Sequence, residues 1–122
     1  MYSCSMERKE PLKAVFYKSL QGNQPCREFL LSLDRDDRRE VGSDIFAVQQ
    51  GFPLGLPLCR KMDKDLWEIR SEVADGICRL FFTVKDKTMI LLHGFIKKTQ
   101  KTPINELETA KNRLSEFREQ NR

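Results

Sequence analysis

The hydrophobic positions in the first half of the chain follow two different spacings. Residues 12–19 alternate roughly between apolar and polar side chains, a pattern typical of a half-buried strand. Residues 26–33 and 34–51 instead repeat apolar side chains every three or four positions, which predicts two helices. Pro25 suits the first turn of the first helix, and Gly51 suits the end of the second. Residues 52–65 carry two prolines and a glycine and are predicted to form a loop.

The second half of the chain predicts three strands followed by a helix. Residues 66–70, 76–84 and 88–97 are rich in aliphatic, β-branched and aromatic side chains, and short polar turns separate them. The last segment has Thr102 as N-cap, a proline in the first turn, and an apolar stripe formed by Ile104, Leu107, Ala110, Leu114 and Phe117. The element order is β-α-α-β-β-β-α. We expect an α+β fold, with helices packed on one face of a small antiparallel or mixed sheet.

Length indicates the number of domains, and net charge indicates the kinds of partner that are possible. The chain has 122 residues and shows no internal repeat or linker, so we expect residues 1–122 to form a single domain. Residues 1–11 are expected to be a disordered N-terminal extension. The 22 lysines and arginines exceed the 18 acidic residues, which gives a net charge of +4. That charge permits a polyanionic partner without requiring one.

Four cysteines, Cys4, Cys26, Cys59 and Cys78, are spread along the chain, and no two are spaced as CxxC. With a single histidine, they offer few ligands for zinc, so we expect no metal and no other cofactor. The first residues have no apolar core of the length that a signal peptide needs, so we expect none, and no apolar run reaches membrane-spanning length. We therefore expect a cytoplasmic protein without membrane contact and with free thiols, Cys26 and Cys78 filling the core.

Alternation along the strands sorts the remaining side chains by face. If Ile69, Leu80 and Phe82 pack under the helices together with Ile90, Leu92 and Ile96, the opposite face is chemically rich. That face would gather Glu68, Arg70, Arg79, Phe81, His93, Phe95 and Lys97.

These side chains suffice for cleavage of RNA without a metal ion. Guanidinium groups hold phosphates and stabilise charge that develops on them. An aromatic ring supports an unstacked base, and a carboxylate or histidine removes the proton of a ribose 2′-OH. Structural explanations are open as well: Glu68 and Arg70 as members of an ion-pair network, His93 as a hydrogen-bonded structural residue, and the lysines as protection of an edge strand.

The runs "LWEIR", "GICRL" and "HGFIKKTQKTP" resemble motifs of the phage-derived, HigB-like branch of the RelE/HigB toxin superfamily. The resemblance covers roughly residues 64 to 114. It implies a RelE-like, microbial-ribonuclease-type fold and a type II toxin. Such toxins are ribosome-dependent, metal-independent endoribonucleases that cut mRNA in the A site through 2′-OH attack. A HigA-like helix-turn-helix antitoxin neutralises them.

The resemblance also assigns roles to particular residues. It implies catalytic roles for Glu68, Arg70, Arg79 and Lys97. RNA or phosphate binding is expected for His93, Phe95, Lys98, Thr99 and Lys101. Many relatives end in a segment with a catalytic tyrosine or histidine, and the last predicted helix has neither. Two alternatives therefore stay open: an inactive toxin fold kept as a regulatory partner of the antitoxin, and a protein that binds duplex DNA through its basic rim.

Overall fold

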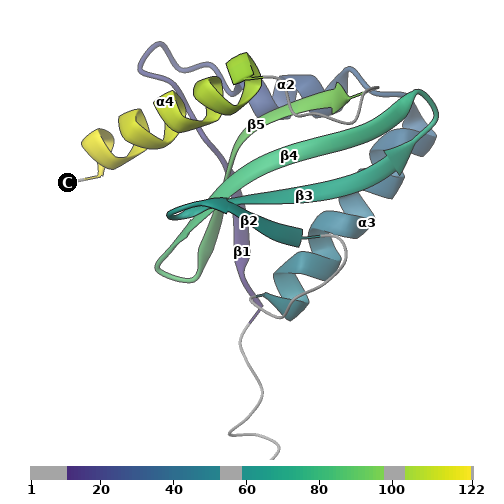
Figure 1. Ribbon diagram of the computed structural model, residues 1–122, viewed down its shortest axis with the longest axis horizontal. Helices are drawn as coiled ribbons and strands as arrows, with labels where there is room; N and C mark the ends of the chain where they lie inside the picture. Colours follow the sequence, from purple (N-terminus) through teal and green to yellow (C-terminus); the bar gives the residue numbers. More distant parts are fainter. Residues whose placement is uncertain (1–10, 53–58, 98–103, 122) are drawn as a thin grey trace, which may run out of the picture.

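A computed structural model describes residues 11–52, 59–97 and 104–121 of the chain. In this part, the fold is α+β, with a five-stranded mixed sheet and three helices (Figure 1). The elements are β1 (Lys13–Phe16), α2 (Pro25–Leu31), α3 (Arg35–Gly51), β2 (Cys59–Asp63), β3 (Leu66–Val73), β4 (Gly76–Lys85), β5 (Thr88–Lys97) and α4 (Ile104–Gln120). The expected extension, residues 1–11, lies outside the described residues except for its last position.

The sheet has the strand order β1-β5-β4-β3-β2. β1 is parallel to β5, and every other neighbouring pair is antiparallel. A two-residue turn connects β4 to β5, with positive φ angles of 52° at Asp86 and 61° at Lys87. Two positive φ angles in succession give the turn the twist that a tight hairpin needs. This hairpin confirms the predicted meander of the last three strands.

The predicted element order lacked one strand, because residues 52–65 were expected to form a loop. Cys59–Asp63 is the edge strand β2 and pairs with β3, with a register shift between Lys61 and Asp63. Its sequence, CRKMD, is charged and has no alternation of apolar side chains, so periodicity gave no strand signal. As an edge strand, it is held by backbone pairing and by the contacts of individual side chains rather than by a buried face.

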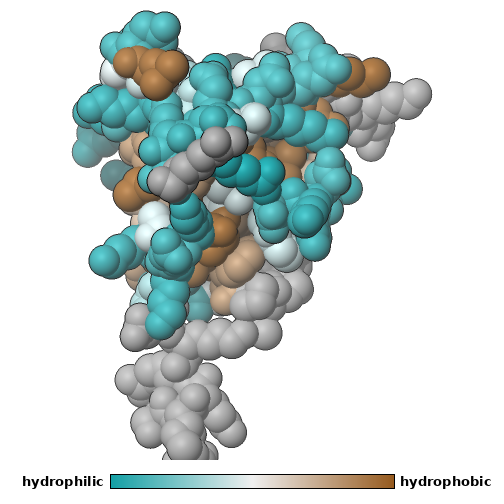
Figure 2. Space-filling model, turned by 90° about the vertical axis from the view of Figure 1, so that its left-hand side faces the viewer, coloured by the Kyte–Doolittle hydropathy of each residue, from teal (hydrophilic) through white to brown (hydrophobic). Residues whose placement is uncertain are grey.

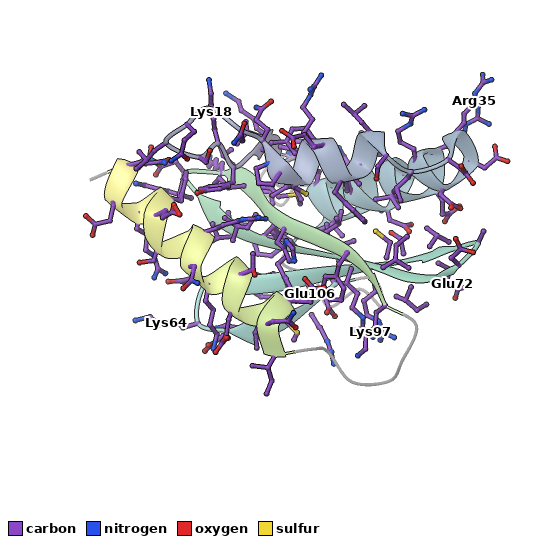
Figure 3. All side chains as sticks on the ribbon, turned by 90° about the horizontal axis from the view of Figure 1, so that it is seen from above. Lys18, Arg35, Lys64, Glu72, Lys97 and Glu106 are labelled. Atoms are coloured by element: carbon purple, nitrogen blue, oxygen red, sulfur yellow. The ribbon has the colours of Figure 1, made fainter. Side chains whose placement is uncertain are left out.

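The expectation that all helices cover one face of the sheet was also wrong. α2 and α3 cover one face, and α4 covers part of the other (Figures 1 and 3). The apolar stripe of α4 needs a partner, and the second face supplies Phe81, Leu92 and Phe95 for it. The fold therefore has three layers with a hydrophobic core on each side of the sheet.

An irregularity in β5 explains why simple alternation misplaced two residues. Phe81 pairs with His93, but the next residue, Phe82, pairs with Leu91, so Leu92 is an extra residue in β5. Ile90 and the extra residue Leu92 face α4, whereas Ile96, after the bulge, faces α2 and α3. The extra residue reverses the parity of the strand. As a result, only Ile96 of the three lies where the sequence predicted.

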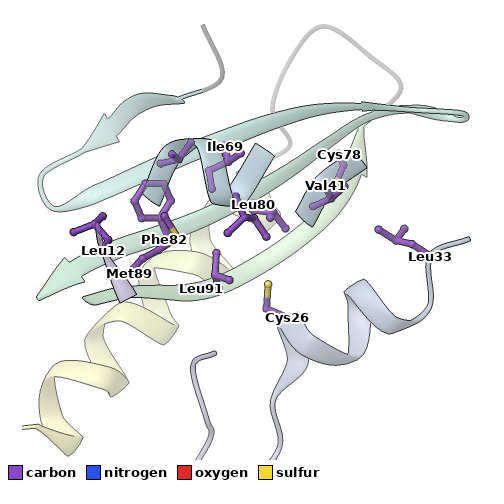
Figure 4. Packing of buried hydrophobic residues seen from close by; sticks show 12 residues of the cluster. Leu12, Cys26, Leu33, Val41, Ile69, Cys78, Leu80, Phe82, Met89 and Leu91 are labelled. Atoms are coloured by element: carbon purple, nitrogen blue, oxygen red, sulfur yellow. The ribbon is translucent and has the colours of Figure 1, made fainter. Parts of the chain in front are cut away.

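The first core lies between the sheet and helices α2 and α3 (Figure 4). Helix α3 contributes Val41, Ile45 and Val48, as its periodicity predicted. Cys26 and Cys78 are fully buried, and burial raises the pKa of each thiol to about 12. The described cysteines are free thiols, and these two fill the core as expected.

Gly94 marks a close approach between β5 and α2. A Cβ atom at this position would lie 2.6 Å from Leu80 Cδ2 and 2.6 Å from Phe29 Cδ2. The Phe29 ring therefore packs directly on the backbone of β5, which explains why a glycine interrupts this apolar strand.

The second core lies between the sheet and α4, where Ala110 and Leu114 are buried. Ile104, the first residue of the predicted stripe, is exposed instead. The side of the molecule shown in Figure 2 is mainly hydrophilic, with small separate hydrophobic patches. None of the helices in the described ranges is long and apolar enough to cross a membrane.

Candidate functional site

A buried carboxylate, Glu68 on β3, lies between arginines from the two neighbouring strands. Arg79 Nη1 on β4 donates to both carboxylate oxygens, at 3.1 Å to Oε1 and 3.0 Å to Oε2. Arg60 Nε on β2 donates to Oε1 at 3.0 Å. The Glu68 side chain has no exposed surface, and that of Arg79 is 5% exposed. The carboxylate on β3 therefore holds two guanidinium groups, one from β2 and one from β4, at fixed positions.

Two further cations lie on the same face of the sheet. Arg70 is two residues after Glu68 on β3, pairs across the strands with Arg79, and is exposed. Lys97 ends β5, where it is diagonal to Arg79, and is 4% exposed. Burial lowers the pKa of Lys97, and the charges of Arg79, Arg60 and Arg70 lower it further, while Glu68 opposes the shift. The field at Lys97 is thus dominated by positive charge.

Strand alternation correctly placed Glu68, Arg70, Arg79 and Lys97 on one face. It missed Arg60, because this residue lies in the segment predicted as a loop. A regular hairpin about the turn Lys64-Asp65 would pair Arg60 with Ile69, and the register shift between Lys61 and Asp63 moves Arg60 opposite Glu68 instead, so no sequence signal indicated this contact. The register Arg60↔Glu68 places opposite charges directly across the pair, an arrangement that stabilises antiparallel strands.

A buried donor in this cluster lacks an acceptor among the described residues. Arg79 Nε is buried and forms no hydrogen bond with the part of the chain that the structure describes. A buried polar group without a partner is uncommon and costs free energy. Such a donor beside several cations is suited to an anionic ligand.

His93 lies on the same face, but its two ring nitrogens are already engaged with α4. Nε2 is 2.6 Å from Glu106 Oε1, and Nδ1 is 3.0 Å from Arg113 Nη1. Because arginine only donates, Nδ1 accepts and the Nε2 proton is donated to Glu106. Burial lowers the pKa of His93, as does Arg113, whereas Glu106 raises it. This arrangement matches the structural explanation of His93, in which it fastens α4 to β5.

The aromatic side chains of this face pack on one another. Phe81 and Phe95 are buried, with ring centroids 5.8 Å apart, and the His93 ring stacks at 5.8 Å from that of Phe95. In this packing, Phe95 belongs to the core beneath α4, and no face of its ring is offered to a base. Its predicted contact with RNA would require this packing to open.

Three predicted phosphate-binding residues, Lys98, Thr99 and Lys101, lie outside the described residues. Figure 3 shows Lys97 at the end of β5, beyond the first turn of α4 that carries Glu106. Tyr17, a tyrosine of the second core, donates its hydroxyl to Glu116 Oε2 at 3.0 Å. Its hydroxyl is therefore engaged with the C-terminal half of α4 and not with the arginine cluster.

The arrangement of Glu68 and its cations suits the binding of a phosphate group. Guanidinium groups recognise phosphate oxygens through paired N–H donors, and charges shielded from water act more strongly. In the ranges that the structure describes, no three His, Cys, Asp or Glu side chains lie where they could share a metal ion.

Comparison with known families identifies the group to which the chain belongs. Residues 28–115 match the family model described as phage derived protein Gp49-like (DUF891). None of the curated proteins compared with the chain matches it. The matched range runs from α2 into α4 and includes β2 to β5, and hence every residue of the Glu68 cluster. The chain therefore belongs to the Gp49-like family of phage-derived proteins, a RelE/HigB-like toxin family of toxin–antitoxin systems.

Proposed function

We propose that this protein is the toxin of a type II toxin–antitoxin system, and that it cleaves mRNA on the ribosome without a metal ion. Family membership supports the toxin role and implies an antitoxin partner. The observation that carries the ribonuclease proposal is the cluster of cations around Glu68 on one face of the sheet. A HigB-like branch, a RelE-like fold and a HigA-like antitoxin remain part of this proposal.

In the proposed reaction, the scissile phosphate first meets Arg70, because this arginine is exposed and forms no hydrogen bond or ion pair among the described residues. Arg79 then stabilises the charge that develops on the phosphorane, with its unpaired Nε–H available as a donor. Arg79 and Lys97 are each 4% exposed, so the phosphate reaches them through local side-chain movement.

The 2′-oxygen must lose a proton as it attacks the neighbouring phosphorus; the bond between phosphorus and the 5′-oxygen of the next nucleotide breaks, that oxygen takes a proton from water, and a 2′,3′-cyclic phosphate is left. Lys97 is our candidate for the proton acceptor, because it lies diagonal to Arg79 at the end of β5 and because burial and the neighbouring arginines lower its pKa. Glu68 was predicted to be catalytic; because both of its oxygens accept hydrogen bonds from arginine, we propose that it acts by positioning those arginines.

Primer extension on a defined mRNA in a reconstituted translation system tests the proposal. We expect cuts only when ribosomes are present, and at least a tenfold loss of cutting in Arg70→Gln. Arg39→Gln is the matched control, because Arg39 is also an exposed arginine but lies on α3, across the sheet from the cluster. Cuts without ribosomes would exclude the A-site mechanism, and equal cutting by both variants would exclude a role for this face.

One observation favours the alternative of an inactive toxin fold that only binds the antitoxin. On the sheet face, the described acid Glu68 and the histidine His93 are both held in hydrogen bonds. If the folded wild-type protein binds its antitoxin but produces no cuts with ribosomes, this alternative replaces the ribonuclease proposal.

A further inference from the structure

We infer that Arg60, on the edge strand β2, is an additional phosphate-binding residue of the site and that Glu68 holds it in position. The inference rests on the proposed function for the nature of the anion, a phosphodiester of RNA. Arg60 lies outside the set of residues that the sequence motifs indicate, because its strand has no apolar periodicity.

Among the described residues, the side chain of Arg60 forms a hydrogen bond through Nε and none through its two Nη groups. Nε donates to Glu68 Oε1 at 3.0 Å, and the two Nη groups form no hydrogen bond or ion pair among the described residues. The side chain is 52% exposed, whereas its carboxylate partner is fully buried. An arginine anchored through Nε keeps the donors of its two Nη groups available, and these donors match the oxygens of one phosphate.

The position of Arg60 extends the site across the sheet. The register places Arg60 opposite Glu68, and the next strand places Arg79 diagonal to Glu68. The Glu68 carboxylate therefore lies between the exposed guanidinium of Arg60 and the buried guanidinium of Arg79. A chain that carries a phosphate at each nucleotide would then contact Arg60 at the edge of the sheet and Arg79 nearer its centre.

A matched arginine elsewhere in the molecule makes the inference testable. Arg118 on α4 also forms one ion pair, Nη2 to Asp65 Oδ2 at 2.8 Å, and its side chain is 53% exposed. Residue type, exposure and number of carboxylate partners among the described residues are thus nearly the same as for Arg60. The difference is that Asp65 is an exposed turn residue and not part of the Glu68 cluster.

The probe is a short single-stranded RNA with 2′-O-methyl groups, which cannot be cut by 2′-oxygen attack. Its affinity is measured by fluorescence anisotropy at several salt concentrations, without ribosomes. We expect Arg60→Gln to weaken binding about tenfold and to reduce the slope of log K against log salt by about 0.7. Arg118→Gln should leave the affinity and the slope close to those of the wild type, and thermal midpoints show that both variants are folded.

Equal binding by Arg60→Gln and Arg118→Gln would overturn the inference, as would the absence of salt-dependent binding by the wild type. The assay separates this outcome from failure of the proposed function. If wild-type protein makes no cuts in mRNA while Arg60→Gln still loses affinity for the uncleavable RNA, the phosphate site stands and the ribonuclease activity does not.

Discussion

Arg79 and Glu68 form a doubly hydrogen-bonded ion pair between neighbouring strands, with Nη1 of Arg79 3.0 Å from Oε2 and 3.1 Å from Oε1 of Glu68. Both side chains are shielded from water. This ion pair should therefore affect both the stability of the fold and the proposed RNA cleavage. A change to either partner leaves a buried charge incompletely compensated.

Replacement of Arg79 by alanine should destabilise the protein. Glu68 would remain buried with the half-exposed Arg60 as its ion-pair partner among the described residues, and the expected loss in the free energy of unfolding is about 3–5 kcal/mol. Urea denaturation at neutral pH measures this loss. Arg39→Ala, on the exposed side of α3, should change stability by less than about 0.5 kcal/mol. An Arg79→Ala protein as stable as the wild type would show that the ion pair does not contribute to the fold.

Glu68→Gln tests whether Glu68 affects RNA binding by positioning Arg60 and Arg79 or only through its negative charge. Removing a negative charge should by itself strengthen the binding of an anion. An amide, however, offers one acceptor oxygen where the carboxylate offers two to Arg60 and Arg79. We expect the second effect to dominate and the affinity for uncleavable RNA to fall about tenfold, equivalent to about 1.4 kcal/mol. Tighter binding by Glu68→Gln in the anisotropy assay would refute the positioning role.

The pH dependence of cleavage should report the ionisation of Lys97. Burial and the nearby arginines lower its pKa from the ordinary value of 10.5, so the neutral amine becomes available at lower pH. The single-turnover rate on ribosomes should rise with pH and level off below 10.5. Lys97→Arg keeps the positive charge but does not deprotonate, so it should cut at least tenfold more slowly and lose this rise. A variant with the wild-type rate and pH profile would exclude Lys97 as the proton acceptor.

Acid should weaken the fold through His93. Its pKa in the folded protein is lowered by burial below the ordinary value of 6.5. As the pH falls below about 6.5, the unfolded chain takes up a proton that the folded protein does not, so the free energy of unfolding decreases until the lowered pKa is passed. Glu106 and Arg113 are the charged groups that face the ring.

His93→Gln tests this contribution, since glutamine can accept from Arg113 and donate to Glu106 without titrating. Denaturation curves recorded at a series of pH values should fall less steeply for the variant in this window. His93 is the single histidine of the chain, which simplifies the comparison. If the free energy of unfolding depended on pH in the same way for both proteins, His93 would not contribute to the pH dependence of stability.

Two glycines should respond to alanine with opposite signs. Gly94→Ala forces a methyl group against Leu80 and Phe29, and we expect a destabilisation of about 1–3 kcal/mol. Gly42 lies within helix α3 and has no atom within 4 Å of an added Cβ, so Gly42→Ala should stabilise by about 0.5–1 kcal/mol. Thermal unfolding of both variants checks the contrast. Destabilisation by both substitutions to the same extent would contradict the close approach at Gly94.

The amino-acid sequence determined the elements whose stability depends on local pattern. Helix α3, strands β3 to β5 and the buried stripe of α4 follow from periodicity, because burial of one face selects the same spacing wherever it occurs. Alternation also gathered Glu68, Arg70, Arg79 and Lys97 on one face. The prediction that these four side chains share a face did not depend on how the helices pack.

Only the tertiary structure decided the remaining features. β2 is a strand because β3 offers it a partner, and Arg60 joins the site for the same reason. One extra residue in β5 reverses the side to which Ile90 and Leu92 point, and this change of face gives α4 a surface on which to pack. Periodicity reports which side chains share a face, whereas pairing register and bulges decide which face that is.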